Sequence, residues 1–114
     1  MWRDDAYFLD ILNAARRVVQ YTTGMTGEEF ERDDLTQDAT MRQLGIIGEA
    51  ARKVSQETRN AHPEIPWVEI IGMRNRLIHE YSRINLPRVW DTIKNDIPPL
   101  ITLIEPLVPP PEEE

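Results

Sequence analysis

Apolar residues recur at three- and four-residue steps along most of this chain, which is the pattern of amphipathic α-helices. Residues 5–23 predict the first helix, and its inward positions are Phe8, Ile11, Leu12, Ala15, Val18, Val19 and Thr22. Gly24 follows as a stop signal. Residues 24–35 predict an acidic, exposed connector, in which Thr26 and Glu29 are spaced to cap one short helical turn.

A second long helix is predicted over residues 36–58. Its apolar stripe consists of Thr40, Leu44, Ile47, Ala51 and Val54. Gly45 and Gly48 interrupt this helix, and each glycine costs about 1 kcal/mol relative to alanine. Glycines kept at that cost indicate that another stretch of backbone approaches closely here.

A third helix is predicted after a turn at residues 60–66. Pro66 suits the first position of a helix, and the helix then covers Trp67 to about Tyr81. The residues expected to face inward are Val68, Ile71 and either Leu77 or Ile78.

A fourth helix is predicted to start at Pro87. Its inward residues are Val89, Trp90, Ile93 and Ile97. Pro98 and Pro99 should break or kink this helix, and residues 100–104 should continue it for one or two turns.

These elements, with no strand pattern and no internal repeat, predict an all-α fold. We expect an up-and-down helical bundle of four to five helices in one domain, residues 1–108, followed by a disordered acidic tail, residues 109–114. A bundle this small leaves apolar surface uncovered, so we expect a symmetric homodimer. The three tryptophans, Trp2, Trp67 and Trp90, are expected to anchor the core or an interface rather than to stack on bases.

Composition narrows the class of protein. The chain has 114 residues and no cysteine, which excludes a disulfide scaffold, a thiolate metal site and a thiol nucleophile. No apolar run approaches the roughly 18 residues that a membrane span needs. The N-terminus is too acidic for a signal peptide, so we expect a cytoplasmic protein without membrane contact.

The net charge of −7 argues against a nucleic-acid partner, but its distribution changes this picture. Residues 74–88 hold four arginines against the single acid Glu80, so this segment carries +3 and the rest of the chain −10. Arginine pairs with phosphate in a bidentate manner. From charge alone, a phosphate-binding segment and an ordinary solvated helix end stay equally open.

The densest cluster of reactive residue types is the segment 73–81. Arg74 and His79 are five residues apart, about 140° around an ideal helix, while Asn75 and His79 share one face. Histidine transfers protons near neutral pH, and arginine stabilises the charge that grows on a phosphate during cleavage. RNA supplies its own nucleophile, the 2′-hydroxyl, so this chemistry needs neither metal nor cofactor. From spacing alone, a histidine placed at a helix C-terminus for its dipole is the commoner case.

Other candidate sites are weaker. A zinc site built on His62 and His79 would need carboxylates at a recognisable spacing, and there are none. His62, directly before a proline, is expected to be a turn residue. Glu49 could orient Arg74, although an exposed glutamate without a role is the simpler expectation. No glycine-rich phosphate loop is present.

At these residues the chain resembles the HepT-like toxins of the HEPN superfamily. Residues 74–81 are similar to the Arg-x4-His-x-Tyr signature of that family. The likeness runs from about residue 4 to 104. It also includes the segments 44–53, 62–67, 70–73 and 86–90 and the step from Ile97 to Pro98.

The resemblance implies a HEPN bundle whose two copies line one cleft, and metal-independent endoribonuclease cleavage of cellular RNA by Arg74 and His79. Asn75 would be a polar helper, and we expect Arg76 and Arg83 to bind the RNA.

The resemblance also implies a partner, an MntA-like minimal nucleotidyltransferase antitoxin, as in a type VII toxin–antitoxin pair. The antitoxin would transfer AMP to Tyr81, which would place an anion in the phosphate site and repel RNA. The toxin would act as a homodimer or in a larger assembly with its antitoxin. Two alternatives stay open: a non-catalytic module that binds a substrate or nucleotide beside a nucleotidyltransferase, and a purely structural helical partner.

Overall fold

The structure is a computed structural model and describes residues 2–78 and 83–110. Within these ranges the chain forms helices and no strand, apart from an isolated bridge between Ile78 and Ile84. The α-helices are α1 (Trp2–Thr22), α2 (Gly27–Glu31), α3 (Asp34–Lys53), α4 (Gln56–Ala61), α5 (Trp67–Arg76), α6 (Leu86–Asn95) and α7 (Ile97–Ile104), followed by the short 3-10 helix η2 (Glu105–Leu107). The all-α class is confirmed, and the described residues hold more helices than the four or five expected because connectors also form short helices.

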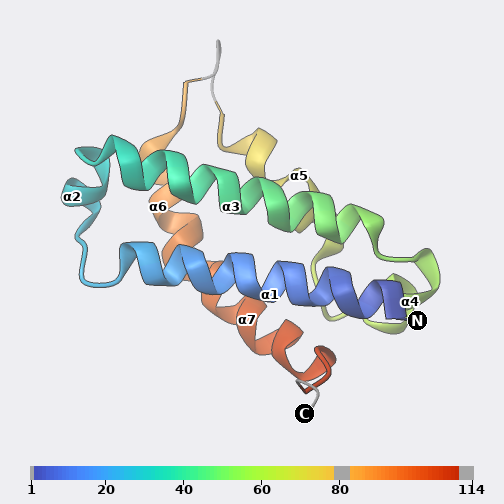
Figure 1. The fold of residues 1–114 in the computed structure, drawn as a ribbon. Helices are drawn as coiled ribbons and strands as arrows, with labels where there is room; N and C mark the ends of the chain where they lie inside the picture. The colour runs from blue at the N-terminus through green and yellow to red at the C-terminus, as the bar shows by residue number, and fades with distance from the viewer. Residues whose placement is uncertain (1, 79–82, 111–114) are drawn as a thin grey trace.

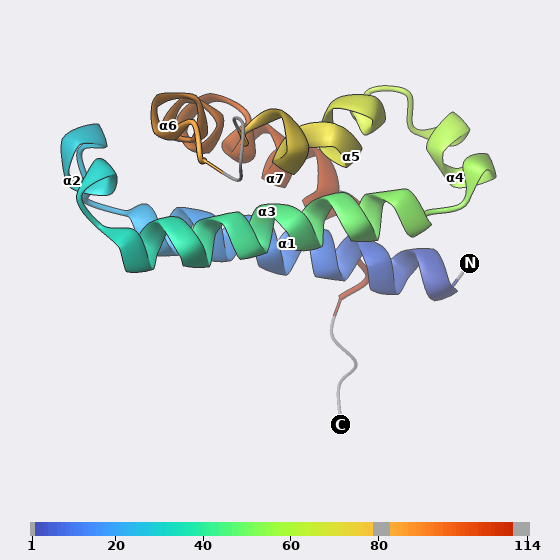
Figure 2. The same cartoon turned by 90° about the horizontal axis from the view of Figure 1, so that it is seen from above.

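The two long helices α1 and α3 lie side by side and antiparallel (Figure 1). Their apolar stripes meet, and the predicted stripe residues of α3 from Thr40 to Val54 are all buried. On α1 the prediction holds except at Val19, which is exposed. Figure 2 shows α5 and α6 covering one face of this pair, with α2 and α4 at its two ends. The helix pair is therefore the platform on which the second half of the chain is laid.

The connector between α1 and α3 folds as its capping pattern predicts. Gly24 takes a left-handed backbone, with φ of 81°, just after α1 ends. The Glu29 amide donates to Oγ1 of Thr26 at 3.1 Å, and the Thr26 amide donates to Oε1 of Glu29 at 2.9 Å. The expectation of a wholly exposed connector is wrong at one residue. Phe30 is fully buried and packs on the ring of Trp90, with 5.5 Å between centroids.

The second long helix ends earlier than predicted, because a carboxylate from α1 starts a new helix. Asp4, which is 3% exposed, accepts hydrogen bonds from the amide of Ser55 at 3.0 Å and from its hydroxyl at 2.7 Å. The Thr58 hydroxyl also donates to Asp4, at 2.6 Å. Ser55 in turn accepts from the Thr58 amide and so caps α4. The predicted helix over 36–58 is thus two helices.

The inward face of α5 differs from the prediction. Val68 is 78% exposed, whereas Ile70 and Met73 are buried. The start of the helix sets this register, because Trp67 is buried and its Nε1 donates to the carbonyl of His62 at 3.0 Å. Anchoring Trp67 turns the next residue outward.

Helix α5 also ends at Arg76, five residues before the predicted end. Leu77 is buried, and its carbonyl accepts a hydrogen bond from the amide of Asn85 at 2.8 Å. The chain turns back toward α6 after this point, which a helix reaching Tyr81 would prevent.

The last two helices begin near prolines, as expected. Pro87 lies in the first turn of α6, and Pro98 and Pro99 lie in the first turn of α7. The predicted inward residues of this part are buried except Trp90, which is half-buried. No helix in the described part of the chain is long and apolar enough to cross a membrane. Residues 111–114 of the predicted tail lie outside the described residues, and the homodimer stays a prediction.

Candidate active site

A concave surface lies between α3 and α5 and has a volume of about 320 Å³. It is lined by Gly45, Gly48, Glu49, Arg52, Ile71, Arg74 and Asn75. The surface therefore combines the small-residue stretch of one predicted helix with the start of the reactive cluster of another.

Gly48 allows α5 to lie directly on α3. A Cβ atom at this position would stand 3.2 Å from the carbonyl oxygen of Ile71 and 3.4 Å from that of Ile70. These neighbours are backbone atoms, which cannot move aside cheaply. The close backbone approach predicted from the helical glycines is confirmed here.

Gly45 leaves room for the side chain of Arg74. A Cβ atom on Gly45 would stand 3.1 Å from Cδ and 3.5 Å from Nε of this arginine. Arg74 thus reaches from the last turn of α5 across α3, and its side chain remains exposed to solvent. Among the described residues it forms no ion pair with a carboxylate, so its guanidinium is available to an anion.

Glu49 does not pair with Arg74. Its carboxylate instead lies 3.9 Å from Arg52, one turn further along α3, and both side chains are largely exposed. The simpler expectation for Glu49, an exposed glutamate, agrees with this geometry.

Arg52 is a candidate residue that the sequence interpretation missed. It lines the same concave surface as Arg74. The spacing of Gly45, Gly48 and Arg52 places all three on one stripe of α3, and this signal could have revealed it.

The last turn of α5 separates the predicted site residues. Asn75 lines the concave surface with Arg74, so these two are brought together. Arg76 leaves on another side of the helix, where its Nη2 donates to the carbonyl of Glu69 and its Nη1 lies close to Gly72. Arg83 is exposed beside the bridge residue Ile84, and no contact in the structure ties it to the concave surface.

Two of the predicted site residues cannot be placed. His79 and Tyr81 lie outside the described residues, so the catalytic role of the first and the modification of the second stay predictions. His79 is three residues beyond Arg76 in the sequence, and Arg76 is the last residue of α5. Arg74 and Asn75 lie in the same last turn of that helix.

The other candidates, His62, Trp67 and Trp90, do not line the concave surface. His62 ends α4, with Nδ1 3.3 Å from Oε2 of Glu64, and its ring packs edge-on against Phe8. In residues 2–78 and 83–110, no group of three or more metal-ligating side chains gathers in one place. Trp67 and Trp90 pack on phenylalanine rings and serve the core. The Trp2 side chain is not among those described.

Comparison with known proteins agrees with these observations. The family model described as "Ribonuclease HepT-like" matches residues 11–107. The chain is 40% identical over 94 residues to the "Probable ribonuclease HepT" of Thermococcus cleftensis, covering 82% of this chain and 86% of that protein. It is 36% identical over 103 residues to the "Putative RNase MJ0127" of Methanocaldococcus jannaschii, covering 90% and 85%. No solved structure matches it.

Proposed function

Since the chain belongs to the HepT-like ribonuclease family, we propose that it is the toxin of a toxin–antitoxin pair and cleaves cellular RNA without a metal ion. Arg74 and His79 are the catalytic residues of this proposal, and Asn75 is a polar helper. The observation that carries it is the position of Arg74, which lies across Gly45 in a concave surface that also holds Asn75 and Arg52.

Two arginines on one concave surface can bind the phosphate group of an RNA phosphodiester. Arg74 and Arg52 come from different helices, and among the described residues the one carboxylate that lines the surface, that of Glu49, lies beside Arg52. A phosphate held here meets fixed donors that stabilise the charge developing in the transition state.

The chemistry then needs one group that moves a proton. In the proposed reaction His79 takes the proton of the 2′-hydroxyl, whose oxygen attacks the adjacent phosphorus. The bond from phosphorus to the 5′-oxygen breaks, and that oxygen takes a proton from solvent water as it leaves. The products are a 2′,3′-cyclic phosphate and a 5′-hydroxyl end.

The test is RNA cleavage by the purified full chain in EDTA. Arg74→Ala and His79→Ala should each lower the cleavage rate by roughly 10²-fold or more while leaving the far-UV circular dichroism unchanged. Arg32→Ala is the matched control, because Arg32 is an exposed arginine at the C-terminal end of α2 whose ion pair among the described residues is with Glu28, at 3.7 Å. It should cleave like the wild type.

Wild-type cleavage by Arg74→Ala would contradict the catalytic assignment. RNA binding without cleavage in any buffer would favour the alternative, a non-catalytic module that binds its substrate beside a nucleotidyltransferase. Equal effects of Arg74→Ala and Arg32→Ala would favour a purely structural role.

Regulation by an MntA-like antitoxin is part of the proposal. The antitoxin would transfer AMP to Tyr81, and the added phosphate would compete with RNA for the arginines. Tyr81→Phe should therefore keep RNA cleavage and lose AMP incorporation, as measured by mass spectrometry of the co-expressed pair. Incorporation that persists in this variant would place the modified residue elsewhere.

We also propose that the toxin acts as a homodimer whose two concave surfaces share one cleft. Light scattering of the purified chain measures the mass directly, and a fully active monomer would contradict this part. Arg76 and Arg83 are proposed as RNA-binding residues outside the catalytic pair.

A further inference from the structure

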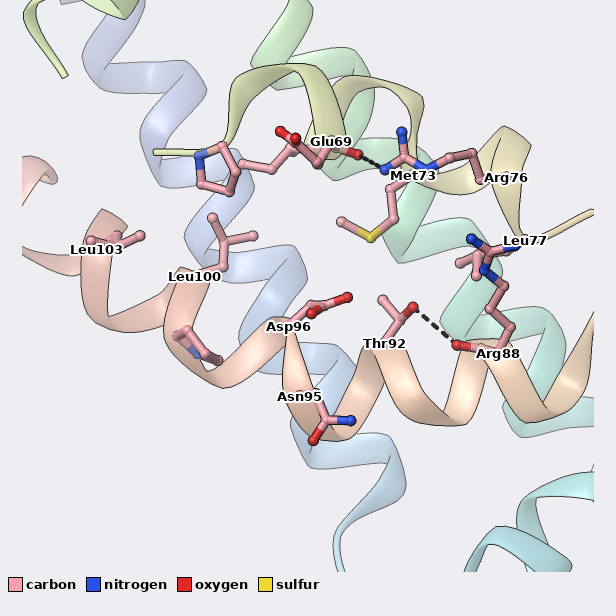
Figure 3. A pocket seen from close by; sticks show the side chains of 13 residues that line it. Glu69, Met73, Arg76, Leu77, Arg88, Thr92, Asn95, Asp96, Leu100 and Leu103 are labelled. Atoms are coloured by element: carbon pink, nitrogen blue, oxygen red, sulfur yellow. Dashed lines mark hydrogen bonds between the residues drawn. The ribbon is translucent and has the colours of Figure 1, made fainter. Parts of the chain in front are cut away.

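A second pocket opens on another side of α5, between this helix and the α6–α7 pair, and encloses about 370 Å³ (Figure 3). Ligand sites in proteins span roughly 300–1,000 Å³ and combine an apolar lining with a few placed polar groups. This pocket has that composition. Its floor holds the buried side chains of Ile70, Met73, Leu77 and Leu100, and charged side chains stand around it.

The charged groups of this pocket are separated along its length. Figure 3 shows Arg76 and Arg88 near Leu77, with the Arg76 guanidinium turned back along α5 toward Glu69, whose side chain also lines the pocket. The apolar residues Leu100 and Leu103 form the other end, and the carboxylate of Asp96 points inward between the two ends. A ligand that matches this arrangement carries a negative charge at one end of a flat, largely apolar body with hydrogen-bond donors.

The arginine end is built to receive an anion. Arg76 is held by the Glu69 carbonyl, and neither guanidinium forms an ion pair with a carboxylate of the described residues. Arg88 lies in the first turn of the ten-residue helix α6, where Asn85 caps its amide at 3.3 Å. The positive end of the α6 dipole adds to the positive charge of Arg88.

The carboxylate of Asp96 has no structural task in the described chain. Asp96 stands at the first position before α7, yet its side chain makes no capping hydrogen bond there. Both of its oxygens are therefore free to accept hydrogen bonds from a ligand. Thr92, by contrast, already donates its hydroxyl proton to the carbonyl of Arg88 at 3.0 Å.

From these positions we infer that the pocket binds one guanine nucleotide of the RNA substrate, with its phosphate on Arg76 and Arg88 and its base over Met73 and Leu100. This inference rests on the proposed ribonuclease function. Among the four bases, guanine alone presents two adjacent N–H donors, on N1 and on the exocyclic N2, to the two oxygens of a carboxylate. Proteins read unstacked RNA bases in this manner, between apolar side chains and by the Watson–Crick edge.

The place of the pocket fits a neighbouring nucleotide rather than the cleaved one. Arg74 and Arg76 are two residues apart on α5 and point to different sides of its last turn. RNA that crosses the end of this helix therefore reaches both surfaces within a few nucleotides. Such a subsite would make cleavage depend on guanosine at a fixed distance from the broken bond.

The test uses labelled 2′-O-methyl hexauridines in which a guanosine, an inosine or an adenosine replaces one uridine at each position in turn. The full chain should bind the guanosine probe roughly tenfold more tightly than the adenosine probe at one position. Inosine keeps N1–H and lacks the amino group, so its affinity should lie between the two. In Asp96→Asn the preference for guanosine should fall below twofold.

Asp91→Asn is the matched control, because Asp91 is an exposed aspartate of α6 that does not line the pocket. It should keep the preference of the wild type. A second variant, Arg88→Ala, should weaken all three probes alike and reduce the dependence of log affinity on log salt by about one unit. Equal binding of guanosine and adenosine probes by the wild type would overturn the proposal, as would a preference that survives in Asp96→Asn.

Two further results separate this proposal from others. If GMP binds in a manner that depends on Asp96 while the hexamers show no base preference, the pocket serves a free nucleotide and the RNA subsite is wrong. The probes lack the nucleophilic hydroxyl, so their binding is measured without cleavage. If the protein prefers the guanosine probe but does not cleave RNA, the proposed function alone is contradicted. If it cleaves RNA normally but shows no preference for the guanosine probe, this inference alone is contradicted.

Discussion

Arg74 crosses α3 at Gly45, and a Cβ atom on that glycine would stand 3.1 Å from Cδ of the arginine. Such a distance is shorter than an ordinary van der Waals contact between these atoms, so an alanine at this position would push the arginine aside. The path of the proposed catalytic arginine therefore depends on a residue in another helix that has no side chain.

The variant Gly45→Ala tests this relationship. Alanine favours the helix by about 1 kcal/mol over glycine, so the free energy of unfolding should stay the same or rise. The cleavage rate should nevertheless fall, by roughly tenfold, because the guanidinium is displaced from the phosphate. Urea denaturation and RNA cleavage on the same preparation measure both effects. A variant as active as the wild type would show that the contact has no bearing on catalysis.

Gly48→Ala should behave differently although it lies only three residues away. Its new Cβ atom would meet the carbonyl oxygen of Ile71 at 3.2 Å, and a backbone atom cannot swing aside as a side chain does. We expect the free energy of unfolding to fall by about 1–3 kcal/mol, since α5 must move away from α3. Thermal denaturation checks this, and an unchanged midpoint would mean that the two helices are not held as closely as the structure places them.

The register of α5 predicts opposite outcomes for two neighbouring apolar residues. Val68→Ser should change the free energy of unfolding by less than about 0.5 kcal/mol, because Val68 is 78% exposed. Ile70→Ala should cost roughly 2–5 kcal/mol, because Ile70 is 2% exposed. Urea denaturation of both variants decides between this register and the one in which Val68 faces inward; a larger loss for Val68→Ser would support the latter.

Asp4 should make the stability of the fold depend on pH in acid. Burial raises the pKa of its carboxyl, but hydrogen bonds from Thr58 and Ser55 outweigh that effect and lower the pKa below its ordinary value of 3.8. A carboxyl whose pKa is lower in the folded than in the unfolded chain stabilises the fold above the unfolded value. This contribution is lost as the pH falls from about 4 through the folded pKa.

In Asp4→Asn the free energy of unfolding should therefore be lower than in the wild type at pH 7, and the difference should shrink below pH 4. Urea denaturation at pH 7, 4 and 3 measures it. Asp10→Asn is the control, since Asp10 is an exposed aspartate on the same helix. A difference between Asp4→Asn and the wild type that stays constant with pH would show that the hydrogen bonds, and not the charge, set the stability.

The candidate site divides into a part that the sequence could predict and a part that it could not. The glycines of α3 and the arginine of α5 were recognisable because helical glycines are costly and the motif has a fixed spacing. Their mutual contact was not, because it depends on how one helix is rotated against another. Arg52 belongs to the predictable part, because its spacing from Gly45 and Gly48 places it on the same stripe of α3.

The boundaries and faces that were predicted wrongly have one kind of cause, a tertiary contact that the helix periodicity does not record. The first helix in the predicted range 36–58 ends at Lys53. Asp4, 51 residues before Ser55, accepts hydrogen bonds from the amide and hydroxyl of Ser55 and so fixes the residue that caps α4. Val68 faces outward because Trp67 is tied to a carbonyl of the preceding turn. Ser55 is a residue type that favours the start of a helix, but its type alone does not show that the preceding helix ends here.

The order of hydrophobic and polar residues alone determined that this chain is helical, that it contains the two long helices α1 and α3, and most of the residues that line their common core. Helix periodicity and capping act between residues a few positions apart. Which side of α5 carries Arg74 and which carries Arg76 was decided only when that helix lay down on Gly48 and Trp67 was buried. Packing of this kind joins residues far apart in the chain, and no local pattern records the rotation of one helix against its neighbour.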